Sequence, residues 1–105
     1  MKVSNNLDIA IKAAIAAGKE ILKIYKSSDL GIEYKSDKSP LTLADKASNR
    51  VIESALRNTN IPILSEEGEV LSYEDRKDLN KLWIVDPLDG TKEFIKKNDE
   101  FTVNI

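Results

Sequence analysis

Cysteine and histidine are both absent from the 105-residue sequence. Without cysteine the chain can form neither a disulfide scaffold nor a thiolate metal site, and without histidine it cannot form an imidazole zinc site. Catalysis by a Ser–His or Cys–His pair is excluded for the same reason. Any metal ion that this chain binds must therefore be held by oxygen, which favours magnesium, calcium or manganese.

An excess of positive charge is also missing. The 16 lysines and arginines are outnumbered by 18 aspartates and glutamates, which gives a formal net charge of −2. A general nucleic-acid-binding protein needs a strongly basic face, so we expect no nucleic-acid partner. Apolar residues make up 41% of the sequence and charged residues 32%, a balance typical of a globular domain.

Long apolar runs are lacking too. No stretch approaches the length that spans a bilayer, and the first residues do not show the basic-then-apolar pattern of a secretory signal. We therefore expect the cytoplasm as the default compartment, with peripheral membrane association left open. The sequence does not indicate an oligomeric state.

The order of the predicted elements indicates an α+β fold in which helices and a sheet form layers. Apolar residues three and four apart predict helices, and short apolar or alternating runs predict strands. The helices are expected at residues 4–27 and 42–57, and the strands at residues 31–35, 61–64, 82–85 and 101–105. A polar loop is expected at residues 35–40, and an exposed loop or short helix at residues 73–81.

The spacing also predicts which side of each helix is buried. The predicted face of the first helix is Leu7, Ile11, Ala14, Ile15, Gly18, Leu22 and Tyr25. The predicted face of the second helix is Leu43, Ala47, Val51, Ile52, Ala55 and Leu56. The alanine-rich middle of the first helix suits close packing against another element.

The sequence stops inside the last predicted strand, with no turn or polar tail after residues 101–105. A natural domain rarely ends within a strand that needs a partner. We therefore expect residues 1–105 to be the N-terminal portion of a larger domain.

The stretch WIVDPLDGTKEF, residues 83–94, carries the strongest chemical signal. Its apolar start predicts a strand that stops at Pro87, because proline has no backbone N–H to donate. Asp86 and Asp89 then lie at the mouth of this strand, just before a short predicted helix. Hard cations bind such oxygens, and phosphate binds the free N–H groups at a helix start. Taken alone, an acidic turn shaped by aspartate is the commoner explanation of such a motif.

A second predicted strand, residues 61–64, also runs into carboxylates, those of Glu66 and Glu67. If the two strands are neighbours, their acidic ends converge, and divalent cations would relieve the repulsion between like charges. Two magnesium ions there could lower the pKa of a bound water and stabilise the leaving oxygen of a phosphoester. A solvated acidic loop is the alternative.

Backbone and hydroxyl groups complete the predicted site. The Leu88 carbonyl could act as a hard ligand, and the N–H groups of Gly90 and Thr91 could bind phosphate oxygens. The Thr91 hydroxyl could pass a hydrogen bond from Asp45 to an attacking water, so that a phosphate monoester is hydrolysed without a covalent intermediate. Asp45 also has a structural explanation, because residues 42–45, TLAD, match a helix capping box.

The motifs SEEGE (residues 65–69) and WIVDPLDGT (residues 83–91) resemble the inositol monophosphatase superfamily of magnesium-dependent, lithium-sensitive phosphatases. The segments KSPLTLAD (residues 38–45) and KEFIKKNDEFTVNI (residues 92–105) are most similar to its 3'(2'),5'-bisphosphate nucleotidase branch. That branch removes the 3'-phosphate of 3'-phosphoadenosine 5'-phosphate, a by-product of sulfate assimilation, to give AMP and phosphate. The resemblance implies the layered α/β sandwich of sugar phosphatases, present here only as its N-terminal part.

The same resemblance implies metal ligands. Glu66, Asp86 and the Leu88 carbonyl would bind one magnesium ion, and Asp86 would bridge to a second ion that Asp89 also binds. Glu67 would lie next to these ligands without binding the metal itself. Members of this family are much longer, and their remaining part supplies a further aspartate ligand and most of the nucleotide-binding walls.

It also implies catalytic and substrate-binding roles. Asp45 and Thr91 would form the pair that activates water. The nucleotide bisphosphate would be bound by Glu66, Leu88, Asp89, Gly90 and Thr91. Two alternatives stay open: an inositol monophosphatase or other sugar phosphatase, and a non-catalytic fragment that binds metal or a partner.

Overall fold

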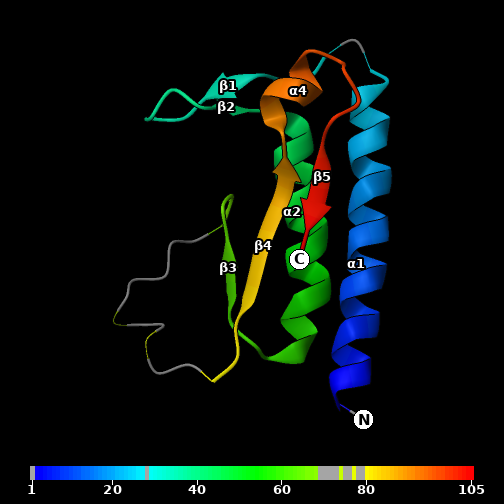
Figure 1. Ribbon diagram of the computed structural model, residues 1–105, viewed down its shortest axis with the longest axis vertical. Helices are drawn as coiled ribbons and strands as arrows, with labels where there is room; N and C mark the ends of the chain where they lie inside the picture. Colours follow the sequence, from blue (N-terminus) through cyan, green and yellow to red (C-terminus); the bar gives the residue numbers. More distant parts are fainter. Residues whose placement is uncertain (1, 28, 69–73, 75–76, 78–79) are drawn as a thin grey trace.

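Two helices lie side by side and cover one face of a three-stranded sheet (Figure 1). The computed structural model describes residues 2–27, 29–68, 74, 77 and 80–105. The helices are α1 (Lys2–Tyr25) and α2 (Leu43–Leu56), and the sheet consists of β3 (Ile63–Ser65), β4 (Trp83–Asp89) and β5 (Thr102–Asn104). The smaller elements are β1 (Glu33–Tyr34), β2 (Pro40–Leu41), the 3-10 helix η1 (Arg57–Thr59) and the short helix α4 (Thr91–Ile95). The predicted packing of two helices beside a sheet that contains both acidic strand ends is confirmed.

The order of strands in the sheet is β3–β4–β5. Strand β3 runs parallel to β4, with Ser65 opposite Val85, and β5 runs antiparallel to β4 on its other edge. The prediction that the strand stops at Pro87 is wrong, because β4 continues to Asp89. Pairing with β3 ends at Val85, and the pairing with β5 is irregular between Asp86 and Asp89, so no ladder hydrogen bond from Pro87 is needed.

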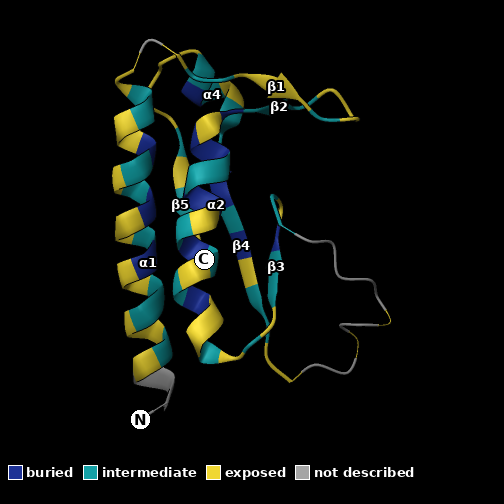
Figure 2. Cartoon of the chain, turned by 180° about the vertical axis from the view of Figure 1, so that it is seen from behind, coloured by how far each residue is buried: buried dark blue, intermediate teal, exposed yellow. Residues whose placement is uncertain are grey.

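The buried face of α1 differs from the predicted one. The residues at its centre that are at most 1% exposed are Ala13, Ala17 and Ile21. The predicted face is largely exposed: Leu7 is 61%, Ile11 49%, Ile15 56% and Leu22 46% exposed. Small side chains let α1 approach α2 closely. Much of the opposite side of α1 is coloured as exposed in Figure 2, and the larger apolar residues of the predicted face are among its exposed residues.

The buried face of α2 differs from the predicted apolar face because it includes polar residues. Of the predicted apolar set, Ile52 and Leu56 are fully buried, whereas Leu43 is 43% exposed. The same buried side of the helix carries Ala44, Asp45, Ser48 and Asn49. A pattern search that counts only apolar residues therefore misplaces this face.

Two clusters of buried side chains support these elements. Ala17, Ile52, Leu56 and Val85 fill the space between the helices and the lower half of the sheet. Ile21, Ala44, Leu88 and Phe94 form a second cluster beneath the ends of β4 and α4. Phe94 also packs with the rings of Tyr25 and Phe101, with centroids 4.9–5.1 Å apart.

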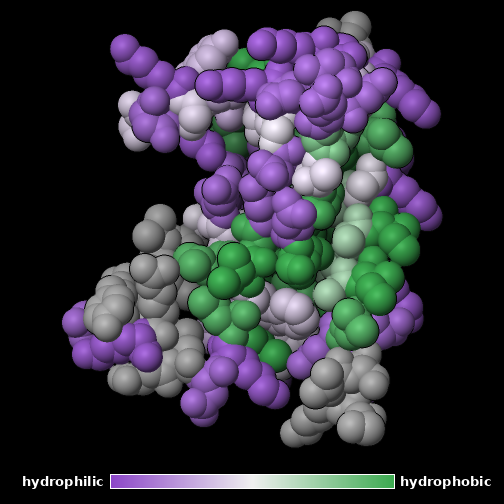
Figure 3. All heavy atoms as spheres, in the orientation of Figure 1, coloured by the Kyte–Doolittle hydropathy of each residue, from purple (hydrophilic) through white to green (hydrophobic). Residues whose placement is uncertain are grey.

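The sheet face turned away from the helices is not covered by any described residue. Ile84 on this face is 67% exposed, and Figure 3 shows an apolar patch over the strands. A parallel strand pair usually has both faces covered. None of the helices in the described part of the chain is both long and apolar enough to cross a membrane.

The region predicted as a strand and a polar loop, residues 31–40, forms a hairpin with the following residue. Strand β2, which we did not predict, pairs antiparallel with β1, and Glu33 lies opposite Leu41. Tyr34 is 70% exposed, so the hairpin has little core of its own. The predicted exposed segment 73–81 lies mostly outside the described residues.

Candidate active site

Two strand ends place carboxylates at the same edge of the sheet. Because β3 and β4 are parallel, the carboxyl end of β3 at Ser65 lies beside Val85, where pairing between the two strands stops. Glu66 follows β3 directly, and its N–H extends the ladder by donating to the Val85 carbonyl at 3.3 Å. Asp86 is the next residue of β4, so Glu66 and Asp86 meet at one edge, as the sequence predicts. Open α/β sheets commonly bind ligands at such an edge.

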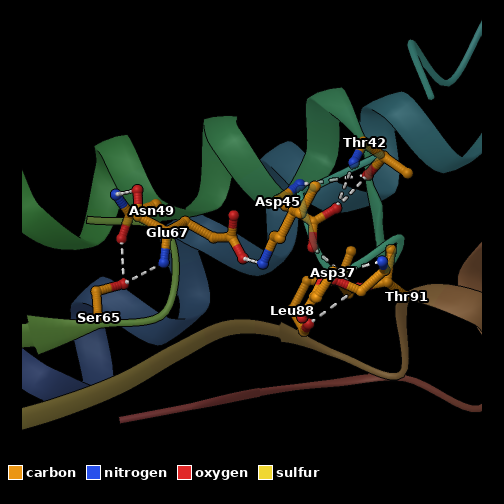
Figure 4. A network of polar contacts seen from close by, with 10 residues as sticks. Asp37, Thr42, Asp45, Asn49, Ser65, Glu67, Leu88 and Thr91 are labelled. Carbon is orange, nitrogen blue, oxygen red and sulfur yellow. Dashed lines mark hydrogen bonds and ion pairs between the residues drawn. The ribbon is translucent and has the colours of Figure 1, made fainter. Parts of the chain in front are cut away.

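Asp45 is brought to this edge by the start of α2. It is 2% exposed, and its Oδ2 accepts hydrogen bonds from the Thr42 N–H at 2.7 Å and the Thr42 hydroxyl at 2.6 Å. The Thr42 hydroxyl in turn accepts from the N–H groups of Ala44 and Asp45, which completes the predicted capping box. Figure 4 shows this arrangement. Since one carboxylate oxygen is used by the cap, the other remains for the site.

That second oxygen contacts Thr91. The Thr91 hydroxyl lies 2.9 Å from Oδ1 of Asp45 and donates a hydrogen bond to it. The two residues are 46 positions apart in the sequence. The structure therefore brings together the two residues predicted to activate water, and the capping role of Asp45 is compatible with this pairing.

The turn after β4 presents its backbone to the same place. Gly90 has φ 92°, and a side chain there would place its Cβ 2.7 Å from the Glu100 carbonyl oxygen, so only glycine fits. Helix α4 starts directly afterwards at Thr91. Leu88 has its side chain in the core, while its carbonyl oxygen lies 3.4 Å from the Thr91 hydroxyl.

Burial and neighbouring charges shift the pKa values of two groups at this edge. Burial, reinforced by the charges of Glu66 and Asp89, raises the pKa of the Asp86 carboxyl above its usual value. Burial alone would lower the pKa of the Lys35 ammonium, but its contact with Glu67 and the charges of nearby carboxylates raise it. The site thus contains a repulsive acidic cluster with one lysine at its border.

Several positioning residues were missed by the sequence analysis. The Ser48 hydroxyl donates to the Pro87 carbonyl at 2.7 Å and joins α2 to the last part of β4. The Ser65 hydroxyl donates to Oδ1 of Asn49 at 2.5 Å, and the Asn49 amide donates to the Glu67 carbonyl at 3.3 Å (Figure 4). Ser48 and Asn49 share helical spacing with Asp45 and Ile52, and this spacing is the signal that would have placed them on the buried side.

A pocket of about 240 Å³ opens beside these groups. Lys35, Glu66, Glu67, Thr91 and Lys92 contribute to its wall. Larger hollows of about 590 Å³ occur elsewhere, including one along α1 and α2, but the catalytic pair and the strand-end aspartates do not line it.

The donor set fits a hard divalent cation. The groups at this edge are carboxylates and a backbone carbonyl, which are the oxygen ligands that magnesium uses. Burial is the main reason that the pKa of Asp86 is raised, and the charges of Glu66 and Asp89 add a repulsion that a cation would relieve. Among the described residues, no group of three or more acidic side chains is arranged so as to hold a metal ion.

Comparison with known proteins gives a consistent picture. The sequence profile of the inositol monophosphatase family matches residues 2–105. The chain is 47% identical over 102 residues to the 3'(2'),5'-bisphosphate nucleotidase CysQ of Buchnera aphidicola, covering 94% of this chain and 38% of that protein.

Solved structures agree with the sequence match. The crystal structure of CysQ from Bacteroides thetaiotaomicron superimposes with a TM-score of 0.79 at 50% identity, covering 96% of this chain and 36% of that one. An IMPase of Thermotoga maritima superimposes with a TM-score of 0.77 at 27% identity, covering 94% of this chain and 37% of that one. The chain therefore spans less than two-fifths of the length of these three relatives.

Proposed function

Because this chain belongs to the inositol monophosphatase family, we propose that it is the N-terminal portion of a 3'(2'),5'-bisphosphate nucleotidase. The reaction is hydrolysis of the 3'-phosphate of 3'-phosphoadenosine 5'-phosphate to AMP and inorganic phosphate. The observation that carries the proposal is the hydrogen bond from the Thr91 hydroxyl to the buried Asp45, beside two acidic strand ends. The greater identity to proteins named CysQ favours this substrate class. A cytoplasmic location remains a prediction from the sequence.

The oxygen groups at the sheet edge would hold magnesium. Glu66, Asp86 and the Leu88 carbonyl are the proposed ligands of one ion, and Asp86 and Asp89 those of a second. When bound, the ions would supply Lewis-acid activation of water and stabilisation of the leaving oxygen. Burial, together with the charges of Glu66 and Asp89, raises the pKa of Asp86 and so disfavours its ionised form without a cation, which supports this assignment.

The chain's own residues supply the proton path. The Thr91 hydroxyl donates its hydrogen to Asp45, which leaves a lone pair on the Thr91 oxygen to accept a hydrogen bond from water. Proton transfer from that water through Thr91 to the Asp45 carboxylate would make the water oxygen a nucleophile. The N–H groups of Gly90 and Thr91 are the proposed donors to phosphate oxygens. The rigid turn at Gly90 keeps these groups in place.

The second candidate function is an inositol monophosphatase or another sugar phosphatase. The structural similarity to the Thermotoga maritima IMPase supports it. A substrate panel on the full-length protein separates the two. We expect phosphate release from 3'-phosphoadenosine 5'-phosphate at a kcat/KM at least roughly tenfold above that for inositol 1-phosphate, since a site that binds a second phosphate discriminates strongly. The reverse order would assign the protein to the other branch.

Magnesium is expected to stabilise the folded 105-residue chain. For a dissociation constant of about 1 mM, about 10 mM magnesium contributes about 1.4 kcal/mol, which raises the unfolding midpoint by roughly 5–10 °C. Calorimetric melting measures the shift, with sodium at matched ionic strength as the control. An unchanged midpoint at about 10 mM magnesium would contradict a metal site formed by this chain alone.

A further inference from the structure

Two adjacent glutamates, Glu66 and Glu67, follow strand β3, and they are held very differently. The Glu67 side chain is 8% exposed and forms an ion pair with the Lys35 ammonium. Its backbone is fixed as well, because its N–H donates to the Ser65 hydroxyl and its carbonyl accepts from the Asn49 amide. Glu66 is exposed, and its carboxylate has no ion-pair or hydrogen-bond partner among the residues that the structure describes.

Lys35 reaches Glu67 from the β1–β2 hairpin. The lysine side chain is 32% exposed and lines the same pocket as Glu66, Glu67 and Thr91. Its positive charge acts on Glu66 and Asp45 in addition to Glu67. A second ion pair, between Lys46 and Glu33 at 2.9 Å, joins the same hairpin to α2. The hairpin therefore places Lys35 at the border of the acidic site and is joined to α2 by a second ion pair as well.

We propose that Lys35 is a positioning residue that neutralises Glu67 and keeps it out of the metal-ligand set, so that Glu66 is the glutamate that binds the cation. This inference rests on the proposed function, because it assigns ligands within that site. The Glu67 carboxylate is buried and paired with an ammonium, and the Glu67 backbone is fixed by two hydrogen bonds, so this carboxylate is not free to turn toward a metal ion. Lys35 thereby limits both the number of ligands and the net negative charge that a magnesium ion meets.

Removing Lys35 should therefore have opposite effects on stability and on magnesium affinity. Replacing Lys35 by methionine keeps much of the apolar stem but leaves the Glu67 carboxylate unpaired, so the unfolding midpoint should fall. The same change makes the pocket more negative and frees a carboxylate. Magnesium should therefore bind more tightly, with a dissociation constant lowered roughly three- to tenfold. A purely structural role for Lys35 would lower the midpoint without tightening magnesium binding.

The test measures magnesium binding by titration calorimetry to the full-length protein that carries this chain. Lys35→Met, Glu67→Gln and the double variant are compared with the parent, with Lys46→Met as the matched control. We expect Lys35→Met to tighten binding, Lys46→Met to leave it unchanged, and Lys35→Met to have a much smaller effect once Glu67 is glutamine.

Three results decide between the explanations. If Lys35→Met raises the magnesium affinity equally with and without the Glu67 carboxylate, the proposed role of the Lys35–Glu67 pair is wrong. The positive charge of the lysine alone would then explain the effect. Unchanged or weaker binding by Lys35→Met would overturn it as well. Failure of all the proteins to bind magnesium would instead overturn the metal site of the proposed function, and with it the premise of this inference.

Discussion

Asp45→Asn in the full-length protein is expected to lower kcat by roughly 10²–10⁴-fold while leaving the fold nearly intact. The amide oxygen of asparagine can still accept hydrogen bonds from Thr42, so the cap of α2 is retained. The amide cannot take up the proton that passes through Thr91, because it is not basic. Its NH₂ group would also turn the Thr91 hydroxyl into an acceptor and so misorient the attacking water.

The measurement is kcat with 3'-phosphoadenosine 5'-phosphate, together with the unfolding midpoint and the magnesium dependence of the rate. Magnesium dependence should change little, because Asp45 is not assigned as a ligand. Asp8→Asn is the control, since Asp8 lies on the exposed side of α1 in a surface ion pair with Lys12. If Asp45→Asn turns over at the rate of the parent, Asp45 only caps the helix and the proposed catalytic pair is wrong.

Asp89→Asn is expected to lower both the rate and the affinity for magnesium. Asp89 is the last residue of β4, and its charge contributes to the repulsion at Asp86. The substitution keeps the size of the side chain but removes the charge that binds a hard cation. We expect the magnesium concentration for half-maximal rate to rise roughly 10–100-fold or more. Substitution of residues that only hydrogen-bond to a metal ligand already has effects of that size.

Rates measured over a range of magnesium concentrations separate this variant from Asp45→Asn. Saturating magnesium should restore part of the activity of Asp89→Asn and none of the activity of Asp45→Asn. A magnesium dependence of Asp89→Asn equal to that of the parent would show that Asp89 is not a ligand.

The motifs of the candidate site were easier to recognise in the sequence than the packing around them, and the roles of their residues stay predictions. Asp45, Asp86 and Thr91 stand in local motifs whose turn and capping chemistry can be read from a few neighbouring residues. The parallel pairing of β3 with β4 then brings the strand ends together. The sequence left open whether these two strands are neighbours, so the convergence of Glu66 with Asp86 was conditional on a pairing that only the folded chain shows.

The helix faces were harder to predict. Size and hydropathy favour Leu7 and Ile15 as core residues of α1, yet the face with Ala13 and Ala17 is the one that meets α2. Two helices can pack closely only where the side chains between them are small, and a hydropathy pattern gives such small residues little weight. Amphipathic spacing therefore identified the helix but not the element against which it packs.

Lys35 was missed for a different reason. The loop composition of residues 35–40 is typical of an exposed segment, and the hairpin has only two residues in each strand. Two ion pairs set the position of the hairpin. Lys35 pairs with Glu67, 32 residues away, and Glu33 pairs with Lys46, 13 residues away. Contacts at such separations leave no periodic trace in the sequence, so only the folded chain reveals that this loop borders the site.

The most direct test of the proposed function is release of inorganic phosphate from 3'-phosphoadenosine 5'-phosphate by the full-length protein, with magnesium and with excess chelator. We expect AMP and phosphate in equal amounts with magnesium, and loss of nearly all turnover with chelator, because water activation and leaving-group stabilisation both depend on the ions. Absence of turnover with magnesium present, or the same rate in chelator, would contradict a magnesium-dependent phosphatase site built on Asp45, Thr91 and the acidic strand ends.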